Sequence, residues 1–377
     1  MNFRTLLCWG VLLSGMNIFS GCEKEIVQHD IEGEMQQLMT SDNLPSLTAC
    51  IIKNDEVVWT KTFGYSNLDD GIEADEETIY HIGSISKLFI VTAIMQLEEQ
   101  GKIDLDDDLS NYLPLKLRHP LYNDIPITAR MLLTHTAGLS SPQTYDGEKG
   151  MWNQYEPDKG PPPSEWVPQF LIPSGVYYDS NLWNSVEPGT YEFYSNIGFC
   201  IAAYVVEYLS GENFRDYCKN HIFAPLKMQR TSYNYSDLDW NKIAIMYNNQ
   251  HEGSIYFDNR VYASGGAKST ILDLSRFASC YLNKGILDGY RILNENSINK
   301  ILEIQNQASG RCLAWEEYLG NWFGHTGGLL RGAASTFLIN PKSKTGIIIF
   351  TNSFSGLVIP GGDIFWLVRQ KANNYIY

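Results

Sequence analysis

The stretch His81-Ile-Gly-Ser-Ile-Ser-Lys-Leu-Phe-Ile-Val-Thr-Ala-Ile-Met95 is the part of the sequence around which the other motifs are organised. It places Ser84 three residues before Lys87, and apolar residues then recur at helical spacing. A helix that begins near Ser84 puts both side chains on one face, because residues three apart are neighbours on a helix. A hydroxyl in the first turn also lies near free backbone N–H groups and the positive end of the helix dipole. The pattern predicts a serine nucleophile with a lysine partner.

The serine–lysine pair alone is a weak signal, because both residue types are common and the same spacing recurs at Ser297-Ile-Asn-Lys300. That second copy follows Asn294 on a polar helical segment, where a capped or solvated turn is the ordinary interpretation. We therefore expect Ser297 to be structural. Ser84 is distinguished by motifs that lie further along the chain.

The size and charge of the chain limit its possible functions. It has 377 residues, of which 44% are hydrophobic, enough for a large core in one domain or in two intergrown domains. Its formal net charge of −15 argues against a nucleic-acid partner, because phosphate binding requires a basic surface. Downstream of the N-terminus, no stretch reaches the roughly 18 apolar residues of a membrane-spanning helix.

The N-terminus has the pattern of a targeting segment. Arg4 precedes the largely apolar range 6–19, and the range ends in Phe19-Ser-Gly-Cys22. These last residues resemble a bacterial lipobox, whose cysteine receives lipid, although Phe19 stands where leucine is more usual. We expect a lipoprotein signal peptide over residues 1–21, then a tether and a helix over residues 22–45. The chain would be exported and anchored through Cys22 to a membrane of a bacterial envelope; simple secretion and an uncleaved anchor are the alternatives.

The remaining cysteines give no sign of a metal site. They show no C-x-x-C pair and no Cys/His cluster of metal spacing, and several lie in apolar surroundings. We expect buried thiols, although a disulfide is possible in an exported protein. The residues concerned are Cys50, Cys200, Cys218, Cys280 and Cys312.

The order of the predicted elements indicates an α/β (α+β) fold in a domain over residues 46–377. Strands near both ends should form one antiparallel sheet, from about 46–80 and 315–355, flanked by helices, with an inserted all-helical lobe at about 84–265. Strands are expected at 47–53, 57–65, 318–324, 334–339 and 345–351. Helices are expected at 31–39, 127–133, 195–209, 214–221, 270–283, 295–305 and 363–375. Tight turns are expected at Asn54-Asp55 and Gly327-Gly328.

The segment Ser140–Pro188 differs from the rest because it is rich in proline, glycine, tryptophan and tyrosine. Irregular aromatic segments of this length usually cover a core or line a cleft. Two interpretations stay open: an insertion that covers the active site, and plain packing.

Two further motifs contain groups that suit acyl-transfer chemistry. In Tyr194-Ser-Asn196, the tyrosine can relay a proton, and the asparagine can hold a substrate amide or orient the lysine. In His325-Thr326-Gly327-Gly328, the glycines allow a backbone to approach an acyl group, and one N–H can serve as half of an oxyanion hole with that of Ser84. The histidine adds a donor whose charge varies near neutral pH. The alternatives are a turn with a packed tyrosine and a hairpin with an exposed histidine. The letters Lys344-Thr-Gly346 lie between two apolar strands and are not expected to take part.

In this order and spacing, these motifs resemble those of the serine β-lactamase and penicillin-binding-protein superfamily. The resemblance is greatest to the class C β-lactamase-like branch, which includes D-alanyl-D-alanine carboxypeptidases, D-amino-acid peptidases and esterases. Its Tyr-x-Asn and His-x-Gly motifs match the two stretches above, and the resemblance covers roughly residues 45–355. Further similar stretches are Leu132-Leu-Thr-His-Thr-Ala-Gly-Leu139, Glu187-Pro-Gly and Ser264-Gly-Gly-Ala-Lys-Ser-Thr-Ile-Leu-Asp-Leu274.

The resemblance implies a mechanism without metal or cofactor. Ser84 would attack an acyl carbonyl while Lys87 and Tyr194 share the proton transfer, and the sequence does not choose the base between them. The N–H groups of Ser84 and Gly328 would hold the oxyanion, and Asn196 would grip the substrate amide.

The expected substrate is a small molecule or peptide: a D-amino-acid peptide, an ester or a β-lactam. A histidine at position 325, where a lysine would be a permanent cation facing a substrate carboxylate, favours a peptidase, carboxypeptidase or esterase over a true β-lactamase. A non-catalytic penicillin-binding or sensing lipoprotein is the alternative of another class.

Overall fold

The computed structural model describes residues 30–140, 153–254, 256–306, 310–318, 320–329 and 331–375. From Ile31 on, the described residues belong to one compact unit, Ile31–Tyr377. The expected signal peptide and Cys22 lie outside the described residues. Within the described residues, no helix is both long and apolar enough to cross a membrane.

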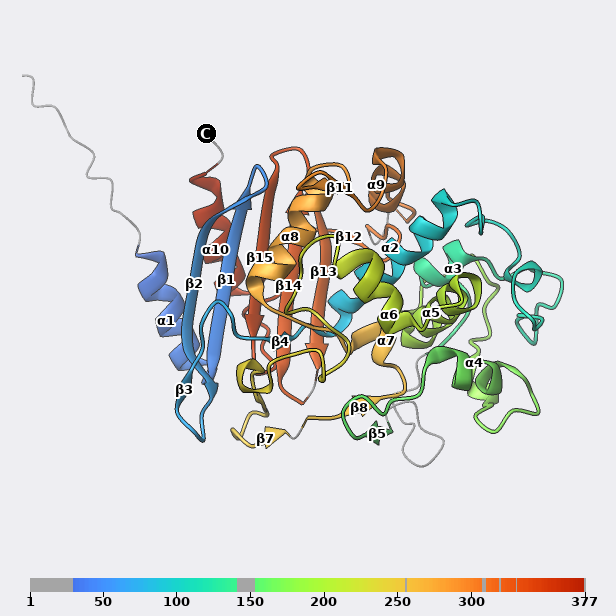
Figure 1. Cartoon of the computed structure of the whole chain (residues 1–377), viewed down its shortest axis with the longest axis horizontal. Helices are drawn as coiled ribbons and strands as arrows, with labels where there is room; N and C mark the ends of the chain where they lie inside the picture. Colours follow the sequence, from blue (N-terminus) through green and yellow to red (C-terminus); the bar gives the residue numbers. More distant parts are fainter. Residues whose placement is uncertain are drawn as a thin grey trace, which may run out of the picture. The chain divides into compact units, whose positions relative to one another are not determined.

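A seven-stranded sheet, antiparallel throughout, forms the centre of the unit, with the strand order β12-β13-β14-β15-β1-β2-β3 (Figure 1). β1 pairs on one side with β2 and on the other with β15, so both ends of the chain build the middle of the sheet, as expected. The strands are β1 (Ser46–Lys53), β2 (Glu56–Asn67), β3 (Ile72–Glu73), β12 (Glu316–Tyr318), β13 (Trp322–Leu329), β14 (Ala333–Asn340) and β15 (Thr345–Thr351).

Helices cover both faces of the sheet because successive strand residues point to opposite sides. Ile347 and Ile349 of β15 pack in one core with α1 (Ile31–Ser41) and α10 (Asp363–Asn373). Ile348 and Phe350, between and beside them in sequence, pack in the other core with α8 (Ile271–Leu282). Both faces of β15 are therefore buried, which explains its continuous apolar run.

The second core extends into a helical lobe between the two halves of the sheet sequence (Figure 1). Its α5 is almost entirely buried and packs against α2, α3, α4 and α7. Short two-stranded ribbons lie among the helices, so the expectation of an all-helical lobe is too simple. The helices are α2 (Ser86–Glu99), α3 (Ala129–Leu133), α4 (Pro163–Leu171), α5 (Asn196–Ser210), α6 (Phe214–Cys218), α7 (Tyr262–Gly265) and α9 (Glu295–Leu302). The ribbons are β4 (Tyr80–His81) with β9 (Lys268–Ser269), β5 (Gln154–Tyr155) with β8 (Asp258–Asn259), β6 (Met246–Tyr247) with β7 (Gly253–Ser254), and β10 (Ile286–Leu287) with β11 (Tyr290–Arg291).

Three local predictions are wrong. The strand expected at 318–324 is a hairpin of β12 and β13, and Gly327-Gly328 lies inside β13 instead of at a turn. The helix expected at 214–221 changes after Cys218 into a π-helical turn, Lys219–Phe223. Glycine pairs are common in turns, but Gly327 and Gly328 lie within a strand, where the missing side chains let another backbone approach.

The aromatic segment is described only in part, because residues 141–152 are outside the described ranges. Within it, α4 buries Trp166 and Phe170 against the core that contains α5. This part of the segment therefore packs against the lobe. The prediction of buried thiols is confirmed: the cysteines of the described residues are free and buried.

Candidate active site

Ser84 lies in a 3-10 turn, Gly83–Ile85, directly before α2. The α-helix itself begins at Ser86, two residues later than the simplest interpretation of the sequence. Ser86 holds the turn, because its Oγ donates to the Gly83 carbonyl at 2.6 Å and accepts from the Ala267 amide at 3.1 Å. The nucleophile candidate is thus fixed from the α2 and α7 sides.

Lys87 is fully buried, and its Nζ lies 3.1 Å from Ser84 Oγ. The same atom is 2.8 Å from Asn196 Oδ1 and 2.8 Å from the Ser264 carbonyl oxygen. Both oxygens can only accept, so they use two N–H bonds of the lysine. A neutral amine then has its lone pair left for the Ser84 hydroxyl. Burial lowers the pKa of Lys87 to about 7, so this neutral form is well populated at physiological pH.

Tyr194 completes the arrangement from the other side of the serine. Its hydroxyl donates to Ser84 Oγ at 2.7 Å, and Lys87 Nζ lies 4.8 Å from the centre of its ring. Although 41% of the residue is exposed, the protein around the hydroxyl desolvates it and raises its pKa to about 12. The phenol therefore stays protonated where the lysine titrates.

The turn that carries Tyr194 and Asn196 is held by His135, which the sequence did not single out as a site residue. The His135 carbonyl accepts from the Phe193 amide at 2.8 Å, and its Nδ1 accepts from the Ser195 amide at 3.0 Å. Its ring packs against the Tyr194 ring, with 4.5 Å between the ring centres. One indication of His135 came from the sequence, because it lies in the family-like stretch Leu132–Leu139. Its role could not be predicted, since it depends on the contact with Ser195, 60 residues later.

His325 is neutral. We expected its charge to vary near neutral pH, but its pKa lies far below that range. Burial, with the nearby positive charge of Lys87, lowers its pKa to about 3. Its Nδ1 lies 2.5 Å from the carbonyl oxygen of Thr326, which can only accept. The proton of the ring is therefore on Nδ1, and Nε2 is left as an acceptor. The expectation of a variable donor at this position is wrong because the side chain is only 4% exposed.

The glycines of β13 lie against the nucleophile turn. A Cβ on Gly327 would stand 2.0 Å from the Ile82 carbonyl oxygen and 2.3 Å from Ser335 Oγ. Gly328 is exposed, and its amide nitrogen lies beside Gly83. The strand thus brings the predicted oxyanion donor next to the residue that precedes Ser84.

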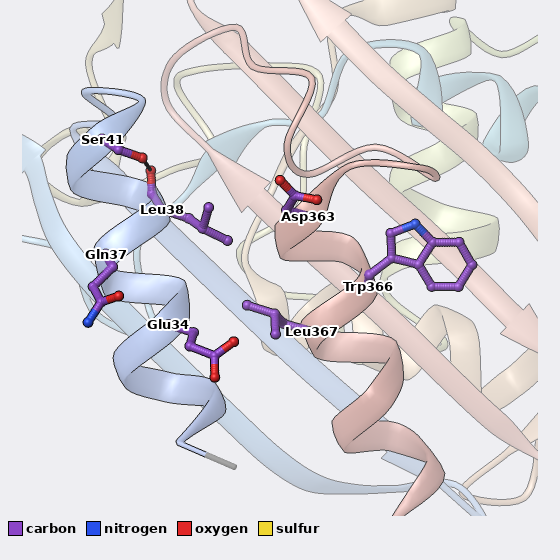
Figure 2. A pocket seen from close by; sticks show the side chains of 7 residues that line it. All are labelled: Glu34, Gln37, Leu38, Ser41, Asp363, Trp366 and Leu367. Carbon is purple, nitrogen blue, oxygen red and sulfur yellow. Dashed lines mark hydrogen bonds between the residues drawn. The ribbon is translucent and has the colours of Figure 1, made fainter.

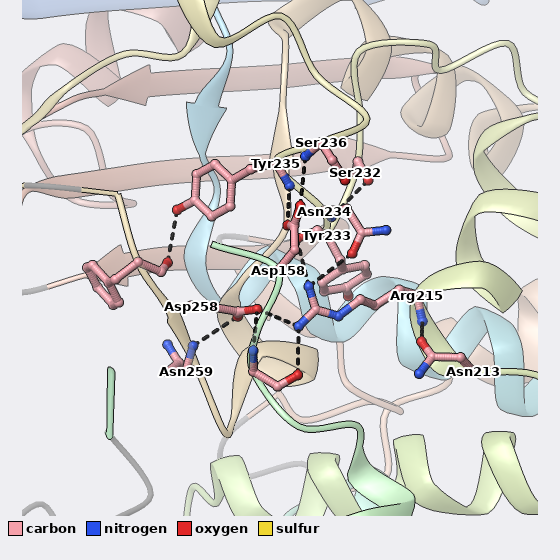
Figure 3. A network of polar contacts seen from close by, with 12 residues as sticks. Asp158, Asn213, Arg215, Ser232, Tyr233, Asn234, Tyr235, Ser236, Asp258 and Asn259 are labelled. Atoms are coloured by element: carbon pink, nitrogen blue, oxygen red, sulfur yellow. Dashed lines mark hydrogen bonds and ion pairs between the residues drawn. The ribbon is translucent and has the colours of Figure 1, made fainter. Parts of the chain in front are cut away.

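A polar network supports the α7 side of the site (Figure 3). Arg215 Nη2 lies 2.5 Å from Asp258 Oδ2, and the guanidinium stacks 3.7 Å from the centre of the Tyr262 ring. Tyr262 begins α7, the helix whose Ser264 carbonyl binds Lys87. This buried ion pair was not evident from the sequence, because its partners are 43 residues apart.

The two other candidate motifs lie elsewhere. Asn294 caps the Ser297 amide at 2.9 Å, and Lys300 pairs with Glu98 at 2.7 Å, so this second serine–lysine pair has structural partners, as expected. Lys344 lies in the turn before β15, and Gly346 pairs with Ile339, at the end of the sheet away from Gly327.

No group of three or more potential metal ligands occurs among the residues that the structure describes. A surface hollow of about 550 Å³ lies between α1 and α10, and Figure 2 shows its lining. It is on the face of the sheet opposite α8, so it does not belong to the Ser84 site. Its lining residues are Glu34, Gln37, Leu38, Ser41, Asp363, Trp366 and Leu367.

Sequence comparisons relate the chain to known proteins over most of its length. The sequence model of the family described as Beta-lactamase matches residues 31–362. The chain is 26% identical to the putative penicillin-binding protein PbpX of Bacillus subtilis (strain 168), over 81% of this chain and 70% of PbpX. It is 24% identical to protein flp of Staphylococcus aureus (strain N315), over 87% of this chain; the match spans only 62% of flp.

Solved structures share the fold. The octameric penicillin-binding protein homologue from Pyrococcus abyssi has a TM-score of 0.73 and 28% identity, over 92% of this chain and 76% of the other. A β-lactamase/D-alanine carboxypeptidase from Pseudomonas syringae has a TM-score of 0.71 and 19% identity, over 91% and 98%. A class C β-lactamase from Rhodobacter sphaeroides has a TM-score of 0.71 and 18% identity, over 92% and 99%. At these low identities, the last two likenesses show the fold, which confirms the expected fold class.

Proposed function

Because the chain belongs to the beta-lactamase family, we propose that it is a serine hydrolase that forms an acyl-enzyme on Ser84. The observation that carries the proposal is the position of Ser84 Oγ, 3.1 Å from Lys87 Nζ and 2.7 Å from the Tyr194 hydroxyl. A base and a proton donor both contact the nucleophile, which is the arrangement that covalent acyl transfer requires.

Lys87 is the general base of the proposed mechanism. Its neutral amine has two N–H bonds for Asn196 and Ser264, and its lone pair faces the Ser84 hydroxyl. Its pKa of about 7 favours this role, whereas the Tyr194 pKa of about 12 leaves very little phenolate at neutral pH. Tyr194 donates to Ser84 Oγ in the resting site and then passes a proton to the leaving group, and Lys87 restores that proton.

The charge that develops on the carbonyl oxygen needs donors. The N–H groups of Ser84 and Gly328 are the proposed pair, and each donor of this kind contributes about 3–4 kcal/mol to transition-state stabilisation. Asn196 lies at the first turn of α5, where its amide contacts Lys87 and can also hold the substrate amide. Water then attacks the acyl-enzyme and releases the acid.

The proposed substrates are D-amino-acid-type peptides or esters. Neutral His325 does not provide the permanent cation that a β-lactam carboxylate would meet at this position. The Pseudomonas syringae neighbour is described as both a β-lactamase and a D-alanine carboxypeptidase, so a true β-lactamase is the second candidate. A non-catalytic penicillin-binding or sensing protein is the third, and the name of the Bacillus relative favours it.

A hydrolysis panel tests the function. A D-alanyl dipeptide, a p-nitrophenyl ester and nitrocefin are compared, with Ser84→Ala as the blank. We expect turnover of the ester or the dipeptide and slow or no turnover of nitrocefin; fast nitrocefin hydrolysis would support the β-lactamase instead.

A fluorophosphonate probe tests the nucleophile independently of substrate. We expect labelling in the wild type and in Ser297→Ala, which removes the serine of the second serine–lysine pair, but none in Ser84→Ala. A wild-type protein that resists the probe and every substrate of the panel favours the non-catalytic alternative.

We also propose that the chain is an exported lipoprotein, anchored to a membrane through Cys22. Labelled palmitate should be incorporated by cells that express the full chain and lost in Cys22→Ala. A wild-type protein found without label in the soluble extracellular fraction contradicts the anchor.

A further inference from the structure

The buried guanidinium of Arg311 joins two carboxylates that belong to different elements. The side chain of Arg311 is only 5% exposed, and its Nε and Nη2 lie 2.9 and 2.8 Å from Glu192 Oε1. Nη2 also pairs with Glu316. Glu192 lies in the segment before α5, and Glu316 begins β12, so one side chain connects the helical lobe to the edge of the sheet.

On the side of the lobe, Arg311 holds the segment that carries Tyr194. Its partner Glu192 lies two residues before Tyr194 in the sequence. The amide of Phe193, between the two, donates to the His135 carbonyl at 2.8 Å. The segment is therefore fixed by a side-chain ion pair and by a backbone hydrogen bond directly before the proposed proton donor.

On the side of the sheet, Arg311 is linked to the β13 motif that contains Thr326. The carboxylate of its partner Glu316 accepts from the Tyr318 hydroxyl, and that hydroxyl also has a hydrogen bond with the Thr326 side chain. Glu316 itself pairs across the sheet with Gly324 of β13. Arg311 thus connects the two motifs that lie on either side of Ser84.

The positive charge of Arg311 reaches the titratable groups around Ser84. Burial has the largest influence on the pKa of each of these groups, and the charge of Arg311 acts in addition to it. At Tyr194 the negative charge of Glu316 opposes Arg311 with a smaller effect. The ion-pair cluster therefore acts on the site mainly as a positive charge. The groups whose pKa values Arg311 lowers are Lys87, His135, Tyr194 and His325.

Lys87 is the group through which this charge affects the reaction. Burial is the main cause of its low pKa; the Cys200 thiol opposes burial, and the charge of Arg311 adds to it. The other titratable groups around Lys87 are uncharged at neutral pH, because burial raises the pKa of the thiol and the phenol and lowers that of the imidazoles. Arg311 is therefore the permanent charge among the groups that influence Lys87. The uncharged groups are Cys200, Tyr194, His135 and His325.

We propose that Arg311 is a positioning residue of the Ser84 site: it joins the Tyr194 segment to the edge of the sheet, and its buried charge favours the neutral form of Lys87. A cation disfavours a second cation nearby, and only the neutral amine can accept the serine proton. Because the guanidinium is buried, Arg311 acts through Lys87 and Tyr194 and not through contact with the substrate. This inference rests on the proposed function, in which Lys87 is the general base for Ser84.

The charge of Arg311 is tested by the pH dependence of ester hydrolysis. The quantity measured is the midpoint, the pH at which kcat/KM for the p-nitrophenyl ester reaches half of its plateau. Arg311→Met removes the cation and leaves two carboxylates nearby, so the midpoint should rise by about 0.5–1 pH unit. An unchanged midpoint in folded Arg311→Met would overturn the role of the charge, since a purely structural residue would lower the rate without moving the midpoint.

Arg311→Lys tests the geometry separately from the charge. A lysine keeps the positive charge but lacks the planar fork that binds Glu192 and Glu316 together, so the midpoint should stay at the wild-type value. The Tyr194 segment should be less well fixed, and kcat should fall about tenfold with KM unchanged, because small displacements of reacting groups are costly. Wild-type kcat in Arg311→Lys would contradict the positioning of Tyr194.

A neutral version of the cluster keeps the test decisive if Arg311→Met does not fold. The triple variant Arg311→Met, Glu192→Gln, Glu316→Gln leaves no unpaired charge, and loss of a whole buried cluster is better tolerated than loss of one partner. Its midpoint should rise, although by less than in Arg311→Met. The double variant Glu192→Gln, Glu316→Gln keeps the cation and is the matched control, so its midpoint should not rise. Equal midpoints in the triple and double variants contradict the role of the charge.

Arg118→Met controls for the loss of an ion-paired arginine elsewhere in the chain. Arg118 binds Asp108 and Ser110, outside the Ser84 site, so this variant should keep the wild-type midpoint and kcat. Fluorophosphonate labelling of Ser84 separates the inference from the proposed function. An unlabelled, inactive wild type contradicts the function itself, whereas a labelled, active wild type whose midpoint and kcat are shared by both Arg311 variants contradicts only this inference.

Discussion

The amide nitrogen of Gly328 lies so close to Gly83 that a Cβ on Gly83 would stand 2.8 Å from it. Gly83 also has a φ of +52°, in the left-handed region where a side chain is strained. The turn that carries Ser84 and the strand that carries the proposed oxyanion donor are thus in direct backbone contact. Their approach depends on the absence of a side chain at this one position.

Gly83→Ala should reduce both activity and stability. The new methyl group pushes β13 away from the nucleophile turn, and the left-handed φ adds strain, together about 1–3 kcal/mol of unfolding free energy. We expect kcat/KM for the ester to fall by at least tenfold, because the oxyanion donors separate. Urea unfolding and ester kinetics measure the two effects.

Gly101→Ala is the control for the backbone strain alone. Gly101 has a φ of +67°, and no atom lies within 4 Å of the position that a Cβ would take, so this variant adds strain without a clash. It should lose some stability and keep wild-type kcat/KM. A similar loss of activity in both variants would show that close approach at Gly83 is not what matters.

The pH dependence of kcat/KM should follow the deprotonation of Lys87. Burial lowers its pKa to about 7, and only the neutral amine can accept the Ser84 proton, so kcat/KM should rise tenfold per pH unit below 7 and level off above it. A pH–rate profile of the ester between pH 5 and 9 measures this. A profile that keeps rising to pH 9 would instead indicate the Tyr194 phenolate as the base.

Stability should also rise with pH, for the same reason. The unfolded chain has lysine pKa values near 10.4 and binds more protons than the folded chain between about pH 7 and 10. Lys268 is equally buried, with its pKa lowered to about 7, and contributes in the same direction. Lys87→Met and Lys268→Met should each weaken the rise of unfolding free energy with pH. Only Lys87→Met should abolish the activity, so the pair separates stability from catalysis.

Tyr194→Phe should lower kcat with little change in structure. The ring keeps its contact with His135, but the hydroxyl that donates to Ser84 at 2.7 Å and protonates the leaving group is lost. Loss of a positioned acid of this kind typically costs about 10²–10⁴ in rate. The fall should be smaller for an ester with a good leaving group such as p-nitrophenol, and equal losses for good and poor leaving groups would contradict proton delivery by Tyr194.

His135 should act as a positioning residue for Tyr194. In His135→Asn, the amide oxygen can replace Nδ1 as acceptor for the Ser195 amide, and asparagine tolerates the left-handed φ of +60° at this position. In His135→Phe, the ring remains but the acceptor is lost. We expect kcat to fall about tenfold in the first and about a hundredfold in the second, because small displacements of reacting groups are costly. Equal KM values and partial rescue by asparagine would identify positioning; the opposite order of the two variants would contradict it.

The sheet was predictable because its strands carry their pattern locally. β15 was placed at its observed bounds, Thr345–Thr351, by a continuous apolar run between turn residues. The same reasoning failed at Gly327-Gly328, since local sequence does not distinguish a glycine pair in a turn from one that admits a neighbouring backbone. The contact that requires a glycine at position 327 comes from Ile82, some 245 residues earlier.

The amino-acid sequence was enough to identify the family resemblance, the central strands, most of the main helices, and the candidate residues Ser84, Lys87, Tyr194 and Asn196, because each motif is short and its chemistry belongs to its side chains. What those side chains can do depends on the folded arrangement. Burial brings Lys87 down to a pKa of about 7 and holds His325 as a neutral acceptor. Glu192, 119 residues away in the sequence, and Glu316, on the neighbouring strand, both pair with Arg311. Protonation and charge balance depend on desolvation and on neighbours in space, which a linear pattern does not contain.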